Sequence, residues 1–73
     1  MEYSIALFST VREVMKADTI CRQHAIGAVI IPVPEKISNQ CGMCLKLPVE
    51  KIARFLELMQ QNKIDTTLYE QHV

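Results

Sequence analysis

The sequence predicts one small α+β domain, in which two helices alternate with four strands in the order βαββαβ. Two short segments show the two-residue alternation of strands, and residues 52–59 repeat apolar side chains at the three- and four-residue spacing of a helix. The chain has 73 residues, of which 49% are hydrophobic and 22% charged, so a globular core is expected. This length allows only one domain, which we place at residues 1–73.

The first half of the chain is expected to form a strand, a helix and a second strand. Residues 3–8 alternate between two faces, with Tyr3, Ile5 and Leu7 on one and Ser4, Ala6 and Phe8 on the other. Thr10 and Glu13 have the spacing of a capping box, so we expect a helix from there to about His24. Its apolar stripe is predicted to contain Val11, Val14, Met15 and Cys21.

The second strand is expected over residues 28–33, which are apolar on both faces. Pro32 and Pro34 place this strand at a sheet edge, because a proline nitrogen donates no hydrogen bond. A polar loop over residues 34–42 then leads to the third strand, residues 43–47.

Pro48 suits the first turn of a helix, which we expect to run to about Asn62. Its predicted apolar stripe contains Ile52, Phe55, Leu56 and Met59. A final strand is expected over residues 65–70.

This element order is that of the ferredoxin-like fold, with an antiparallel sheet in the order 4-1-3-2 and both helices on one face. In that geometry the start of the first helix and the loop before the third strand lie at the same end. We therefore expect Ser9, Thr10 and Val11 to lie close to Cys41 and Gly42.

Composition argues against several classes of protein. Eight basic and eight acidic residues give no net charge, which argues against nucleic-acid binding. No apolar run approaches the roughly 20 residues of a membrane helix, and the N-terminus lacks the pattern of a signal peptide. The expected location is the cytoplasm, where thiols stay reduced.

Cys41-Gly42-Met43-Cys44 is a C-x-x-C motif with several possible uses. A redox disulfide needs Cα atoms within about 7 Å, whereas strand residues three apart are roughly 10 Å apart. A zinc site would need further ligands, and only Cys21, His24 and His72 remain. A metallochaperone of this fold carries its cysteine pair on the loop after the first strand, whereas the pair in this chain follows the second strand. We therefore expect no bound metal or cofactor.

A third use makes Cys41 a single nucleophile, with Cys44 secondary. Gly42 eases approach to the Cys41 thiol, and the first helix turns its amides and positive dipole end toward the same loop. Arg12 and Lys36 are expected to add positive charge there. The plain alternative is that Cys41 is an ordinary loop residue and Cys44 a small strand residue.

The chain resembles the selenium/sulfur carrier protein-like domain family. The resemblance rests on four segments that together span most of the chain: Phe8-Ser9-Thr10, Ile31-Pro32-Val33-Pro34, Ser38-Asn39-Gln40-Cys41-Gly42 and Leu47-Pro48. The chain departs from the family pattern at Cys44, where a small or apolar residue is usual, and at Val11 and Arg12, where many members have a histidine.

The resemblance implies that Cys41 holds sulfur or selenium as a persulfide or perselenide. A protein donor such as a cysteine desulfurase would supply it, and a protein acceptor would take it, so the chain would be a carrier and not an independent catalyst. Ser9, Thr10, Arg12 and Ser38 would surround the loaded group, and Cys44 would be a possible second thiol. The alternative function is a non-catalytic interaction module, or homodimer, whose open sheet face associates through Ala6, Phe8 and the second strand.

Overall fold

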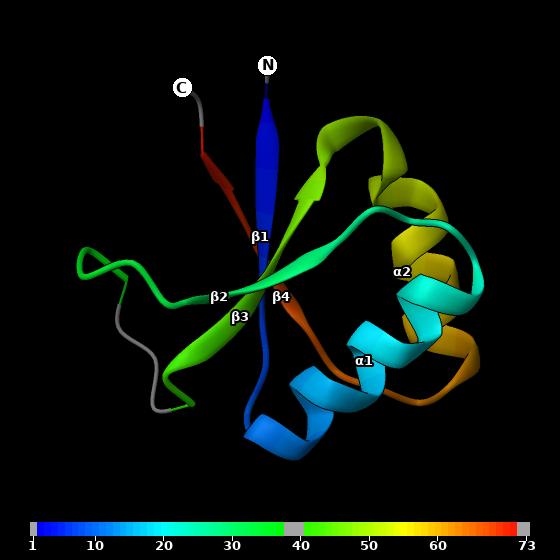
Figure 1. Ribbon diagram of the computed structural model, residues 1–73, viewed down its shortest axis with the longest axis horizontal. Helices are drawn as coiled ribbons and strands as arrows, with labels where there is room; N and C mark the ends of the chain where they lie inside the picture. The colour runs from blue at the N-terminus through cyan, green and yellow to red at the C-terminus, as the bar shows by residue number, and fades with distance from the viewer. Residues whose placement is uncertain (1, 38–40, 72–73) are drawn as a thin grey trace.

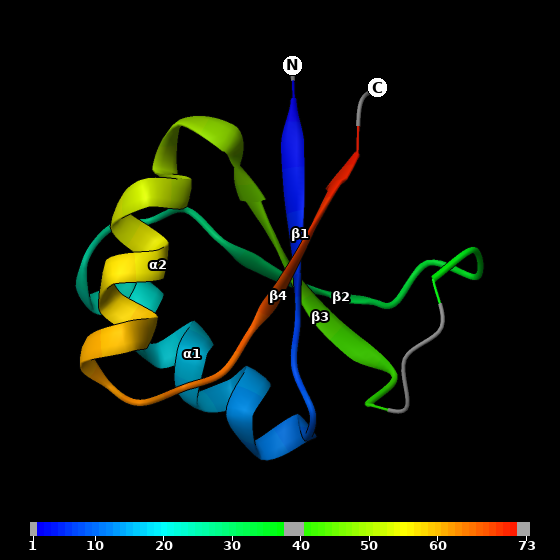
Figure 2. The ribbon, with the colours of Figure 1, turned by 180° about the vertical axis from the view of Figure 1, so that it is seen from behind.

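Residues 2–37 and 41–71 are described by the computed structural model. Along the chain the elements are β1 (Tyr3–Leu7), α1 (Val11–Gln23), β2 (Val29–Pro32), β3 (Met43–Pro48), a short 3₁₀ helix (Val49–Lys51), α2 (Ile52–Gln61) and β4 (Thr67–Gln71). Figure 1 shows both helices on the same side of the strands, and the view from behind in Figure 2 agrees.

The four strands form one antiparallel sheet in the order β2-β3-β1-β4. Read from the β4 edge, this order is 4-1-3-2. The α+β prediction is thus confirmed, with β1 in the interior of the sheet and β2 at one edge. Leu7 lies opposite Cys44 on one side and Thr67 on the other, which fixes how β1 and β3 meet at the end where α1 begins.

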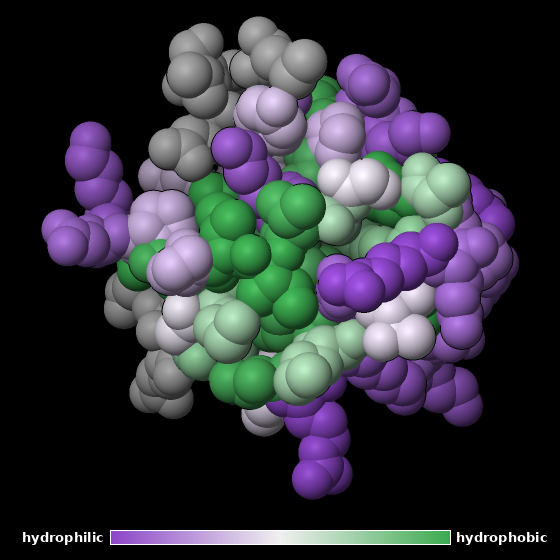
Figure 3. All heavy atoms as spheres, in the orientation of Figure 1, coloured by the Kyte–Doolittle hydropathy of each residue, from purple (hydrophilic) through white to green (hydrophobic). Residues whose placement is uncertain are grey.

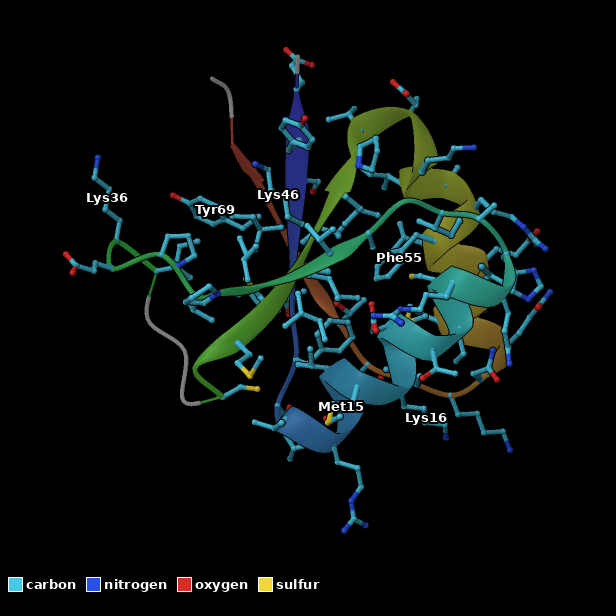
Figure 4. All side chains as sticks on the ribbon, viewed as in Figure 1. Met15, Lys16, Lys36, Lys46, Phe55 and Tyr69 are labelled. Carbon is cyan, nitrogen blue, oxygen red and sulfur yellow. The ribbon has the colours of Figure 1, made fainter. Side chains whose placement is uncertain are left out.

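The main core lies between the sheet and the two helices. It combines strand residues such as Ala6 and Leu45 with helix residues such as Val14 and Phe55, all fully buried. Phe55 points from α2 toward the sheet in Figure 4. Because side chains alternate along a strand, the neighbours of Ala6 on β1 point to the opposite, helix-free face.

Ala6 and Phe8 were expected on the open face of the sheet, and this expectation is wrong. Both residues belong to the core beneath the helices and are 0% and 3% exposed. The helix-free face carries Tyr3, Ile5 and Leu7 instead. Ser4, which shares the face of Ala6 and Phe8, is also fully buried, so alternation identified two faces without showing which one the helices cover.

The edge strand β2 is shorter and more exposed than the sequence indicates. It covers residues 29–32 of the expected 28–33, and Val29 is 53% exposed while Ile30 and Ile31 are half-buried. The apolar sequence of this strand predicts either that both faces are largely covered or that one face is covered and the other is used in association. The exposure of Val29 contradicts the first alternative for the single chain.

The second helix begins later than expected. Pro48 ends β3 with an extended backbone and precedes the 3₁₀ helix, so it does not lie in the first turn of α2. Within α2 the expected stripe is partly wrong, because Leu56 is exposed and Leu58 is buried with Phe55 and Met59. The last strand also begins two residues late, at Thr67.

Helix α1 begins as the capping box predicts. The Thr10 hydroxyl accepts a hydrogen bond from the Glu13 backbone amide at 3.2 Å. Two members of the expected apolar stripe, Val11 and Met15, are nevertheless 42% and 59% exposed, and the buried side of α1 holds Ala17, Asp18 and Ile20 in addition to Val14 and Cys21. Neither helix in the described part of the chain has the length and apolar character needed to cross a membrane.

Candidate functional site

The starts of α1 and β3 lie at the same end of the molecule. Leu7 is the last residue of β1 and pairs with Cys44 near the beginning of β3. The end of β1, which leads into α1, therefore lies beside the start of β3, which follows the long loop, as Figure 1 shows. This placement agrees with the expected grouping of Ser9, Thr10 and Val11 with Cys41 and Gly42.

Cys41 is a half-buried thiol that packs against the helix-side core just before β3. Gly42 next to it has a φ of +82°, and a Cβ there would meet nothing within 4 Å. The glycine is thus favoured by its left-handed backbone and not by crowding. Its carbonyl accepts a hydrogen bond from Val33 at 3.1 Å, which continues the pairing of β2 with β3 up to the residue after Cys41.

The N-terminus of α1 supplies backbone amides and one cation to this end. Ser9, Thr10 and Arg12 are all exposed. The Thr10 hydroxyl is already used, since it accepts from Glu13 and donates to the Glu13 carboxylate at 3.4 Å. Arg12 forms no ion pair or hydrogen bond among the described residues, so its charge remains available at the surface.

One other residue expected near the site, Lys36, does not join it in the structure. Lys36 lies at the far side of the loop between β2 and β3, well away from Met15 and the start of α1, as the labels in Figure 4 show. The expectation that Lys36 adds charge beside Cys41 is therefore wrong. Ser38, Asn39 and Gln40 lie outside the described residues.

Cys44 differs from Cys41 in both burial and orientation. It is 0% exposed, pairs with Leu7 and Ile31 across the sheet, and lies on the face opposite the helices. Its Sγ donates a weak hydrogen bond to the Pro32 carbonyl at 3.9 Å. Burial, followed by the nearby charge of Cys41, raises the pKa of the Cys44 thiol above its ordinary value.

Cys21 is a core residue of α1, as its place on the apolar stripe predicts. It is 1% exposed, and burial together with the negative charge of Asp18 raises its pKa to about 11. Asp18 itself is held by Arg22 at 3.1 Å, the four-residue pair visible in the sequence. A thiol with a raised pKa that is shielded from solvent is a poor nucleophile at neutral pH.

None of the three cysteines is in a disulfide. Within residues 2–37 and 41–71, no three His, Cys, Asp or Glu side chains are grouped so that they could hold a metal ion. Cys41 is thus the cysteine with the greatest access to solvent, and it lies at the end of the molecule where α1 begins.

The sequence did not indicate the exposed apolar surface beside the start of α1. Val11 and Met15 are four residues apart and so lie on one side of α1, at the same end of the molecule as Cys41. Helical spacing assigned them to the core. Ala17 and Ile20, which are buried with Val14 and Cys21, are the sequence signal that the buried stripe is rotated away from them.

Searches of curated proteins and of solved structures gave no match to this chain. A family model does match, over residues 2–70, and its description is "Putative Se/S carrier protein-like". The matched region includes every helix and almost all of every strand, together with all three cysteines. The chain therefore belongs to this selenium/sulfur carrier protein-like family.

Proposed function

We propose that this protein carries sulfur or selenium on Cys41, as a persulfide or perselenide, between a protein donor and a protein acceptor. The chain belongs to a carrier-like family, and the observation that carries the proposal is that its three cysteines differ in burial. Cys41 is half-buried beside a helix start, whereas Cys21 and Cys44 are buried with raised pKa values.

The surroundings of Cys41 suit a negatively charged sulfur. The terminal sulfur of a persulfide is an anion near neutral pH, and backbone amides at a helix N-terminus stabilise anions. The first amides of α1 and the Arg12 guanidinium supply this stabilisation in the proposal. Ser9 and Thr10 contribute through the backbone, because the Thr10 hydroxyl already caps the helix.

Loading and discharge need no separate oxidant. The Cys41 thiolate attacks the terminal sulfur of a donor persulfide, the sulfur–sulfur bond of the donor breaks, and its electron pair leaves with the donor thiolate. Discharge is the same exchange in reverse, with an acceptor thiolate attacking the terminal sulfur and Cys41 departing as the thiolate.

Two features support proteins as donor and acceptor. The thiol lies at the end of the molecule and not within an enclosed core, and the exposed Val11 and Met15 offer apolar contact area at the same end. We take the donor to be a cysteine desulfurase and the compartment to be the cytoplasm, where cysteines such as these three stay reduced.

The proposal is tested by incubating the protein with a cysteine desulfurase and L-cysteine and measuring its intact mass without reductant. The wild-type chain should gain one sulfur atom, and Cys41→Ser should gain none. Cys44→Ala and Cys21→Ala are the matched controls and should load like wild type. A gain that persists in Cys41→Ser contradicts the proposal.

A second candidate function is self-association of the sheet, favoured by the exposure of its apolar residues. Val29 on β2 is 53% exposed and Tyr69 on β4 is 47% exposed, and Figure 3 shows hydrophobic residues gathered on the side where β2 lies in front. In Figure 4 Tyr69 and Lys46 point away from the helices. Sedimentation at several concentrations tests it: a dimer weakened by Val29→Lys supports this function, and a monomer throughout contradicts it.

A further inference from the structure

The two cysteines of the C-x-x-C motif are presented to different sides of β3. Cys41 packs against the core beneath the helices, together with Met43. Cys44 is the residue after Met43, so its side chain points to the opposite, helix-free face of the sheet. There it lies between Leu7 of β1 and Ile31 of β2. Bringing the Cys44 sulfur to Cys41 therefore requires a rearrangement at the start of β3.

Cys44 is also shielded from reagents and from ionisation. It is 0% exposed and its Sγ is directed to the Pro32 carbonyl at 3.9 Å. Burial raises the pKa of Cys44, and the negative charge of an ionised Cys41 raises it further. An anionic persulfide on Cys41 acts in the same direction, so the loaded state itself opposes formation of the Cys44 thiolate.

The shielding of Cys44 affects a side reaction that any persulfide with a neighbouring cysteine can undergo. If the Cys44 thiolate attacked Sγ of a loaded Cys41, a Cys41–Cys44 disulfide would form, and the outer sulfur would leave with the bonding electron pair as hydrosulfide. The carried atom would then be lost. When a thiolate of another molecule attacks the outer sulfur instead, that atom is transferred and Cys41 is restored as a thiolate.

We propose that the folded sheet keeps Cys44 from resolving a group bound to Cys41, so that discharge goes only to a thiol of another molecule. This inference rests on the proposed carrier function, but it concerns the C-x-x-C motif, which the carrier function alone leaves unexplained. Cys44 in this chain is then a buried sheet residue and not a second active thiol. The C-x-x-C motif gives the chain no thioredoxin-type redox function while the protein is folded.

The test uses an aromatic disulfide that forms a mixed disulfide with an accessible thiol and releases a coloured thiolate. In the folded protein one coloured thiolate per chain is expected, with the second aromatic group retained on Cys41. In guanidinium, attack by Cys44 should expel the retained group and form the Cys41–Cys44 disulfide, which peptide mapping identifies. We expect this second release to be on the order of a hundredfold slower in the folded protein, because it requires local opening of the sheet.

Cys44→Ala in a Cys21→Ala background is the key variant, since no second thiol is left in the chain to expel the aromatic group from Cys41 after unfolding. If that variant folds poorly, the comparison of folded and unfolded wild-type protein still decides the matter. Rapid second release from the folded wild-type protein, with a mapped Cys41–Cys44 disulfide, overturns the inference while leaving Cys41 reactive. Absence of any first release overturns both the inference and the proposed function, because a carrier thiol must be accessible.

Discussion

Burial divides the three cysteines into one accessible thiol and two shielded ones. The shielding of a thiol affects how the free energy of unfolding changes with pH. Raising a thiol pKa by burial means that the neutral form is favoured in the folded state. For Cys21 the rise is from an ordinary value of 9.0 to about 11, so the associated stability is fully present below pH 9 and is lost as the pH rises toward 11.

We predict that the free energy of unfolding of the wild-type protein falls by about 1–3 kcal/mol more than that of Cys21→Ala over this range. The alanine variant loses packing at every pH, so the slopes are compared and not the absolute values. Urea unfolding at a series of pH values measures both curves. Parallel curves would mean that Cys21 does not titrate differently in the folded and unfolded states.

Ser4 presents a different residue-level feature, a buried hydroxyl without a partner. It is 0% exposed, and its Oγ has no hydrogen-bond acceptor or donor among the described residues. Burying such a group costs free energy that an apolar side chain of similar size does not. We predict that Ser4→Ala raises the free energy of unfolding by about 1 kcal/mol, while Ser9→Ala, at an exposed position, changes it little. A loss of stability in Ser4→Ala would reveal a partner for the hydroxyl.

At the scale of elements, the start of α1 connects stability to the site. The Thr10 hydroxyl closes the first turn of α1 by accepting a hydrogen bond from the Glu13 amide, and this turn lies at the same end of the molecule as Cys41. Thr10→Ala should lower the free energy of unfolding by about 1 kcal/mol. Thr19 is the matched control, because its hydroxyl bonds the Met15 carbonyl within the helix and Thr19→Ala should be nearly neutral. Equal losses in the two variants would contradict a specific capping role.

The second helix offers a contrast between two neighbouring apolar residues. Phe55 is 0% exposed and Leu56 is 40% exposed. Phe55→Ala should cost about 3–5 kcal/mol, and Leu56→Ala less than about 1 kcal/mol. A 73-residue domain has a total stability of about 4–11 kcal/mol, so the first variant should be largely unfolded at moderate temperature. Thermal unfolding followed by circular dichroism distinguishes the two, and comparable melting temperatures would mean that α2 is rotated from its described position.

These elements also show what the sequence could predict. Capping chemistry is local, so Thr10 and Glu13 identified the start of α1 correctly. The spacing of Ile52 to Met59 identified α2, yet Leu56 lies at the margin of the stripe, where tertiary packing decides burial. On β1 the sequence separated two faces but assigned Ala6 and Phe8 to the wrong one, because only the helices determine which face is covered.

At the scale of the whole molecule, the topology accounts for the candidate site. The order β2-β3-β1-β4 makes β1 and β3 neighbours, and their antiparallel register brings the start of α1 to the start of β3. Sequence reasoning could predict this meeting because it follows from element order. It could not predict that Lys36 lies far from the helix start, because loop conformation follows no periodicity.

The central claim, that Cys41 carries sulfur between molecules, is tested most directly by following the discharge of a loaded chain. The protein is loaded with isotopically labelled sulfur, separated from its donor and mixed with a small-molecule thiol. We predict that the label moves to that thiol and that the protein returns to its unloaded mass with Cys41 reduced, in both wild type and Cys44→Ala. Label that stays on the folded protein, or that leaves as sulfide while a Cys41–Cys44 disulfide forms, would contradict the account.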